Sequence, residues 1–185
     1  MNLKKTRPNK VSPKIKVDEY AFQLTDGVDL MQVDGIHLTT ILCLISEVGL
    51  DLESKFPSAK HFVSWLSLCS NQKITGGKVL SRSTLKNKNH LAYAFRQAAN
   101  TIGNQKDTAL SAFFRRMAFK KGRKLAITAT ARKLAIIVYN MITKKQTYNP
   151  QKLEDYQQKV RIQKIKHIQR TITRLNIDQS DLVFK

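Results

Sequence analysis

The stretch LAITATARKLAIIVYNMI, residues 125–142, is apolar on nearly every side when it is drawn as a helix. Alanine recurs along it, which lets neighbouring helices approach closely, at Ala126, Ala129, Ala131 and Ala135. A helix that is apolar all round belongs in the middle of a bundle. The stretch therefore predicts an all-α fold with this helix at the centre.

Apolar residues recur at helical spacing on both sides of this stretch. Upstream, we expect helices over residues 18–25 and 38–48, a helix after Ser58 with Phe62, Trp65 and Leu66 buried, one from Leu91, and one capped by Asp107. No alternating strand pattern runs beyond residues 78–83. The predicted fold is a compact helical bundle with a glycine-containing basic loop and a C-terminal amphipathic helix.

Three regions are expected along the chain. Residues 1–16 hold six Lys/Arg and two prolines and are interpreted as a basic, flexible lead-in. Residues 17–150 form the helical domain, which ends near the sequence Tyr-Asn-Pro. Residues 151–185 form an amphipathic, basic tail that can pack on the bundle, on a partner or on nucleic acid.

The charge of the chain indicates a polyanionic partner. The formal net charge is +20 at pH 7, and residues 54–153 contain 20 Lys/Arg and one acid, Asp107. A solvated surface usually mixes both signs, so this imbalance favours nucleic acid. Cys43 and Cys69 lack metal-ligand spacing and are expected as free thiols. Without a secretory signal or an apolar run of roughly 18 residues, the chain is expected to be cytoplasmic, near the nucleoid, without a membrane partner.

The sequence KITGGKVLSRSTLKNKNH, residues 73–90, is the densest basic segment that also contains a glycine pair. It does not match a nucleotide-binding loop, which needs Gly-x-x-x-x-Gly-Lys-Ser/Thr between a strand and a helix. The N–H groups of two glycines can still form an anion-binding nest. We therefore expect this loop and nearby arginines to contact phosphates through Gly76, Gly77, Lys78, Arg82, Lys86, Lys88, Arg96, Arg115, Arg116 and Arg123.

A second glycine turn precedes the helix over residues 38–48. The sequence Val33-Asp34-Gly35-Ile36-His37 is similar to half of a helix-hairpin-helix, with His37 in place of the usual second glycine. Unpaired N–H groups at a helix N-terminus can bind phosphate, so Gly35 is a candidate contact. An ordinary N-terminal turn explains the same residues.

Hydroxyl side chains in the basic loop are candidate nucleophiles. Thr75, Ser81 and Ser83 lie among cations, and a reactive hydroxyl needs activation by a base or by positioned charges. His90 is the nearest candidate base along the chain. The sequence does not choose among the three hydroxyls.

Short motifs follow one another in a specific order. They are Asp26-Gly-Val-Asp-Leu, Val33-Asp-Gly-Ile, Ile45-Ser-Glu-Val-Gly, Lys55-Phe-Pro, His61-Phe-x-Ser-Trp-Leu, Ile74-Thr-Gly-Gly-Lys-Val, Ala98-Ala, Ala112-Phe-Phe-Arg-Arg, Ala126-Ile-Thr-Ala-Thr-Ala-x-Lys-Leu-Ala and Tyr139-Asn-Met. In this order, residues 26–150 resemble the C-terminal transposase domain of the IS-one-ten family of insertion-sequence transposases, relatives of the Piv DNA invertases.

The resemblance implies a two-part recombinase. In the family, an N-terminal RuvC-like domain holds a divalent metal such as Mg²⁺ on four acidic residues, and the helical C-terminal domain carries a serine nucleophile. Some members use a structured guide RNA. Many relatives have serine where this chain has Thr75, so Ser81 and Ser83 are alternatives. The metal belongs to the N-terminal domain, which this chain is expected to lack, and no cofactor is expected here.

The expected function is that of a DNA-binding C-terminal portion of an insertion-sequence transposase. Its role is in DNA transposition and recombination, as a truncated fragment without activity alone. The expected partners are transposon-end and target DNA, a guide RNA as an open alternative, and further copies of itself or full-length transposase. The alternative is a structural helical module that associates or interferes with intact transposase through residues 153–175.

Overall fold

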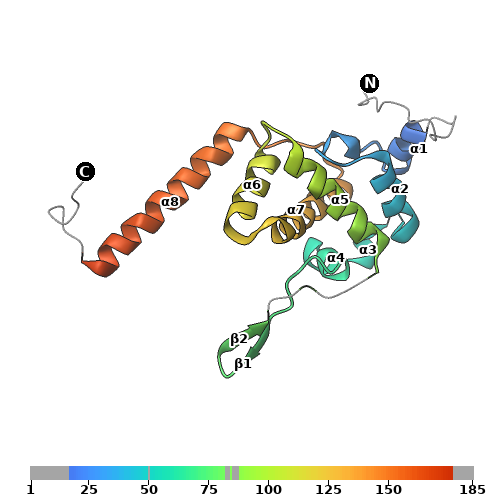
Figure 1. Ribbon diagram of the computed structural model, residues 1–185. Coiled ribbons are helices and arrows are strands. Elements are labelled where there is room, and N and C mark those ends of the chain that lie inside the picture. The colour runs from blue at the N-terminus through green and yellow to red at the C-terminus, as the bar shows by residue number, and fades with distance from the viewer. Residues whose placement is uncertain (1–16, 50, 82–83, 85–87, 177–185) are drawn as a thin grey trace.

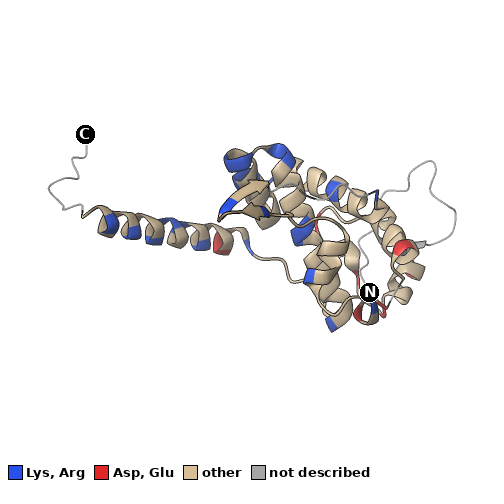
Figure 2. Cartoon of the chain, turned by 90° about the horizontal axis from the view of Figure 1, so that it is seen from below, with Lys and Arg blue, Asp and Glu red and all other residues tan. Residues whose placement is uncertain are grey.

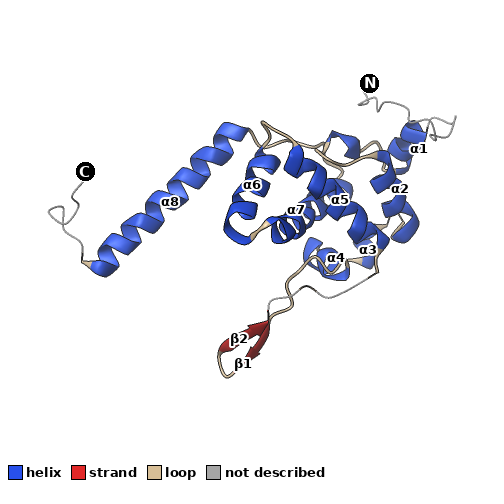
Figure 3. Ribbon diagram, in the orientation of Figure 1, coloured by secondary structure: helices blue, strands red, loops and turns tan. Residues whose placement is uncertain are grey.

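The computed structural model describes residues 17–49, 51–81, 84 and 88–176. Within them the chain is mostly helical, as predicted, and two short strands form one hairpin (Figures 1 and 3). The elements are α1 (Val17–Leu24), a 3-10 turn (Leu30–Gln32), α2 (Leu38–Glu47), α3 (Leu52–Lys55), α4 (Ala59–Trp65), β1 (Lys73–Thr75), β2 (Lys78–Ser81), α5 (His90–Asn104), α6 (Ala109–Lys121), α7 (Arg123–Lys144) and α8 (Leu153–Leu175).

Helix α7 is the centre of the bundle, which confirms the prediction from residues 125–142. It contacts α3, α4, α5 and α6. Its buried side chains lie on more than one side: Ala126, Thr130, Ala131, Leu134, Ala135, Val138, Tyr139 and Met141. By length and composition α7 is also long and apolar enough to cross a membrane, where we expected no such helix. A core helix has the same properties, and α7 packs against four helices of the bundle.

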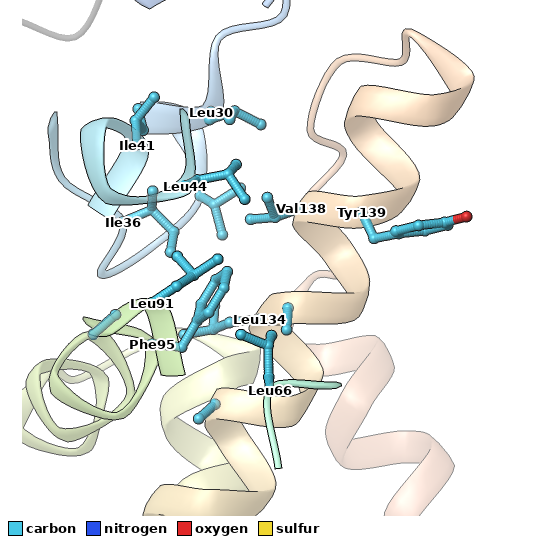
Figure 4. Packing of buried hydrophobic residues seen from close by; sticks show 14 of the residues in the cluster. Leu30, Ile36, Ile41, Leu44, Leu66, Leu91, Phe95, Leu134, Val138 and Tyr139 are labelled. Atoms are coloured by element: carbon cyan, nitrogen blue, oxygen red, sulfur yellow. The ribbon is translucent and has the colours of Figure 1, made fainter. Parts of the chain in front are cut away.

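The main core lies between α2, α5 and α7. Figure 4 shows Leu44 of α2, Phe95 of α5 and Val138 of α7 pointing toward one another. Leu30 and Ile36, from the segment before α2, close the same cluster. Because apolar side chains from residues far apart in sequence share this core, it fixes the position of α5, the helix that follows the basic loop.

An aromatic cluster around Phe62 joins α4 to α5 and α7. The Phe62 ring is fully buried and lies 6.4 Å from Phe95 and 5.9 Å from Tyr139, between ring centroids. The Tyr139 hydroxyl donates a hydrogen bond to the carbonyl oxygen of Phe56 at 2.6 Å. The prediction that Trp65 is buried was wrong: it is 38% exposed and covers the outer side of Phe62.

The N-terminus of α6 is capped by Thr108, so the prediction of Asp107 was wrong by one residue. Thr108 Oγ1 accepts a hydrogen bond from the Ser111 N–H at 3.1 Å, and Ser111 Oγ accepts one from the Thr108 N–H at 3.3 Å. This reciprocal pair is a capping box. Asp107 has a φ of 65°, which is outside the extended conformation of an N-cap residue.

Helix α8 forms as the tail pattern predicted, but it leaves the bundle after its first turns (Figure 1). Tyr156 is its only buried residue. Ile162, Ile165, Ile168 and Leu175 are exposed although they lie at helical spacing. The apolar face that predicted packing is therefore largely free within the chain.

Residues 73–81 form a β-hairpin, where we expected an irregular loop after a helix. Strands β1 and β2 are antiparallel, and the Thr75–Lys78 pair leaves Gly76 and Gly77 as a two-residue turn. Their φ angles of 57° and 74° are the positive values that a type I′ hairpin turn requires at both positions. Lys73, Ile74 and Thr75 were too few to show an alternating pattern, so the first strand was missed.

Candidate nucleic-acid interface

The hairpin extends away from the bundle, and almost all of it is exposed (Figure 1). Strand pairing sets each described candidate hydroxyl opposite a lysine, Thr75 opposite Lys78 and Ser81 opposite Lys73. Side chains of directly paired residues lie on the same face, with Cβ atoms about 5 Å apart. A phosphate bound by either lysine would therefore lie next to a hydroxyl.

The nucleophile assignment stays a prediction. Within the described part of the chain, no histidine or carboxylate is hydrogen-bonded to Thr75, and His90 lies at the start of α5 rather than on the hairpin. Ser83 lies outside the described residues. The hairpin brings Thr75 to the exposed tip and Ser81 toward the bundle.

The glycine pair is explained by the turn. Gly76 and Gly77 both have positive φ, and a Cβ added at either residue would meet no atom within 4 Å. The open space leaves their backbone accessible to a large ligand such as a nucleic-acid strand. Lys78 and Lys88, which follow the turn in the sequence, are exposed, whereas Arg82 and Lys86 lie outside the described residues.

Gly35 lies inside the protein. It has a φ of +78°, and a Cβ there would lie 2.7 Å from the carbonyl oxygen of Ala98 and 2.9 Å from Ile102 Cγ1. Close packing against α5 therefore accounts for this glycine. We leave Gly35 out of the proposed interface, because its backbone faces α5.

Two of the predicted arginines hold helices together. Arg96 donates to the carbonyl oxygen of Ser67 at 3.4 Å, which ties α5 to the end of α4. Arg123 donates to Asn100 Oδ1 at 2.8 Å and to Asn104 Oδ1 at 3.1 Å. Arg123 remains exposed, so its outer edge can still meet a phosphate.

Arg115 and Arg116 were expected to point away from the fold, but only Arg115 is exposed. Arg115 donates to the carbonyl oxygen of Gln105 at 3.2 Å. The Arg116 guanidinium lies 5.5 Å from the centre of the Tyr156 ring and anchors α8 to α6. Its Nε atom is buried without a hydrogen-bond partner among the described residues. Arg116 therefore connects α6 to α8, and we call this contact the α6–α8 joint. The charge of Arg116 is less available to a partner than that of an exposed arginine.

Lys133 of α7 shares this joint. Its Nζ atom lies 4.9 Å from the centre of the Phe113 ring and 5.9 Å from that of Tyr156. Burial, and then the nearby Arg116 charge, lower the pKa of Lys133. Burial raises the pKa of the Tyr156 hydroxyl. The joint thus holds two cations on two aromatic rings, a cation–π arrangement.

Exposed cations that were not singled out from the sequence form two further groups. One lies at the corner between α6 and α7, and the other runs along α8 (Figure 2). The group at the corner consists of Lys120, Lys121 and Lys124. The group along α8 consists of Lys159, Arg161, Lys164, Lys166, Arg170 and Arg174. The absence of acids from residues 108–153 and 156–177 was a signal that could have found them.

Most acidic residues lie around α1, α2 and α3, and two more, Glu154 and Asp155, lie in the first turn of α8 (Figure 2). One of them, Asp26, forms an exposed ion pair with Lys145 at 2.9 Å. Across the described ranges, no three His, Cys, Asp or Glu side chains lie together so that they could hold a metal ion. The described residues therefore do not fit the metal that the family resemblance implies.

Comparison with known families identifies the central part of the chain. Residues 29–115 match the family described as Transposase IS116/IS110/IS902 family. This part of the chain is therefore similar to the transposases of that family. The match includes the hairpin with Thr75, Gly76 and Gly77, and it supports a role in transposition. No curated protein matches the chain, and no solved structure matches it either.

Proposed function

We propose that this transposase domain binds DNA through its phosphate backbone, in the cytoplasm and close to the nucleoid. The contacts are made by the hairpin, by the α6–α7 corner and by the basic side of α8. The observation that carries the proposal is the set of exposed cations at these three places, where acids are rare: the hairpin and the corner have none along the chain, and α8 has acids only in its first turn. Phosphate contacts of this kind position a protein on DNA without reading its sequence.

The charges on α8 are suited to a long polyanion. From Gln157 to Leu175 the helix holds six Lys/Arg and no acid. Lys159, Lys166, Arg170 and Arg174 lie on one side at helical spacing, opposite the exposed Ile168 and Leu175. A stiff helix that carries cations along one side can follow a phosphate backbone over several nucleotides.

Binding to DNA is expected to depend strongly on salt. If six phosphates are neutralised, the affinity falls about 10³-fold between about 50 and 200 mM salt, because released counterions drive the association. Fluorescence anisotropy with duplexes of two unrelated sequences measures both the slope and the lack of sequence preference. The same affinity at both salt concentrations would refute backbone binding.

A charge-reduced variant provides the matched control. Replacing Lys166, Arg170 and Arg174 with glutamine removes three exposed cations without touching the bundle. The slope of log affinity against log salt should fall by about 3, since each phosphate contact contributes roughly 0.9. An unchanged slope would remove α8 from the interface.

A second candidate function is association with another copy or with an intact transposase through α8. The exposed stripe of Ile162, Ile165, Ile168 and Leu175 favours it, because apolar stripes at this spacing pair helices. We expect light scattering to give a dimer for the chain and a monomer for I165S/I168S, whose side chains are 44% and 56% exposed. A monomeric parent chain would overturn this candidate.

A further inference from the structure

The corner between α6 and α7 carries a phenylalanine that has almost no contact with the protein. Phe119 is 94% exposed, more than any other large hydrophobic residue among those described. It lies in the last turn of α6, and Gly122, with a φ of +81°, turns the chain directly into α7. Burial of a phenylalanine ring is strongly favourable, and this position gains almost none of it within the chain.

The charged residues that flank Phe119 along the chain are all basic. Lys120, Lys121 and Lys124 are exposed at the same corner, and the sequence from residue 108 to residue 153 contains no acid. Two such corners would repel each other, so a second copy is a poor occupant. An exposed aromatic ring among cations fits a partner that offers both a flat apolar face and negative charge.

The corner is also held in a fixed position. Arg123, the first residue of α7, donates two hydrogen bonds to Asn100 and Asn104 of α5. Its guanidinium lies 5.5 Å from the centre of the buried Phe114 ring. The Gly122 N–H donates to the carbonyl oxygen of Ala118 at 2.8 Å, which closes the end of α6. The backbone on both sides of Phe119 is therefore held in a fixed position relative to α5.

We propose that Phe119 stacks on an unpaired base of bound nucleic acid while Lys120, Lys121 and Lys124 contact the neighbouring phosphates. The proposal rests on the proposed function, because it names a further contact of the same polyanion. Aromatic side chains bind single-stranded nucleic acid in this way without regard to base identity. An apolar side chain placed between bases can also open a duplex step.

The test is a double-mutant cycle between the side chain and the bases. The parent chain and F119A are titrated with a fluorescent single-stranded oligonucleotide and with a strand of equal length whose central nucleotides are abasic. We expect F119A to lose about 5- to 150-fold in affinity for the normal strand, the range for one stacked base. On the abasic strand, the two proteins should bind equally, with the same salt slope.

Further variants distinguish the outcomes. F119W should keep the affinity of the parent chain for the normal strand. F119L should bind that strand nearly as weakly as F119A does, because stacking needs a flat ring. Y20A serves as the matched control, since Tyr20 is an exposed aromatic residue beside Glu19 on α1. If F119A binds the normal strand as the parent does, Phe119 does not stack, although the proposed function stands. If the parent binds neither strand, the proposed function fails.

Discussion

Replacing Gly35 with alanine is expected to destabilise the protein by about 2–5 kcal/mol. The positive φ of +78° costs a residue with a Cβ about 1–2 kcal/mol, and overpacking in a close-packed core adds about 1–3 kcal/mol. The new Cβ would lie 2.7 Å from the backbone oxygen of Ala98. A backbone atom of α5 cannot rotate away, so α2 and α5 would have to separate.

The hairpin glycine Gly76 provides the control. It also has a positive φ, but a Cβ there would meet nothing within 4 Å. Gly76→Ala should therefore carry only the backbone cost, about 1 kcal/mol, and this cost falls on an exposed hairpin outside the core. Urea unfolding followed by far-ultraviolet circular dichroism measures both variants. Equal midpoints for the two variants would contradict the packing role of Gly35.

Phe62→Ala is expected to cost about 3–5 kcal/mol, the range for removing a fully buried phenylalanine. The substitution empties the centre of a cluster in which Phe62 contacts Phe56, Trp65, Phe95 and Tyr139. These residues belong to α4, α5, α7 and the segment before α4. The cavity would loosen the attachment of α4 and, with it, of the hairpin that follows.

Phe119→Ala is the same chemical deletion at an exposed position. It should change the free energy of unfolding by less than about 0.5 kcal/mol, because substitutions on an open surface rarely do more. Thermal and urea unfolding of both variants give the comparison directly. A loss of stability in F119A close to that in F62A would show that Phe119 packs in the folded protein, and it would also undermine its use in the binding test.

Much of the helical fold could be predicted because helices depend on local periodicity. The apolar residues of α7 predicted its central place, and the apolar spacing that begins at Leu91 predicted the helix α5. The cap of α6 was missed by one residue, since Asp107 and Thr108 are both good N-cap residues and only the backbone conformation decides between them.

The candidate site could be predicted only in part. The hairpin was missed because three residues of β1 are too short for a periodic signal, although Gly76-Gly77 is a typical hairpin turn. The arginines were recognised as cations, but their partners lie far away in sequence. Arg96, for example, bonds to Ser67, and Arg116 lies against Tyr156. A sequence shows that a side chain is charged, but it does not show whether that side chain contacts other parts of the protein or remains exposed.

The sequence by itself determined the helical class, the central helix and the basic character of this protein, because composition and local spacing carry that information. Tertiary structure alone decided which glycines serve packing and which serve a turn, and which cations remain available to a partner. Gly35 and Gly76 show the first difference, and Arg116 and Lys124 show the second. The physical reason is that exposure depends on contacts between residues distant in the chain, which only the folded arrangement brings together.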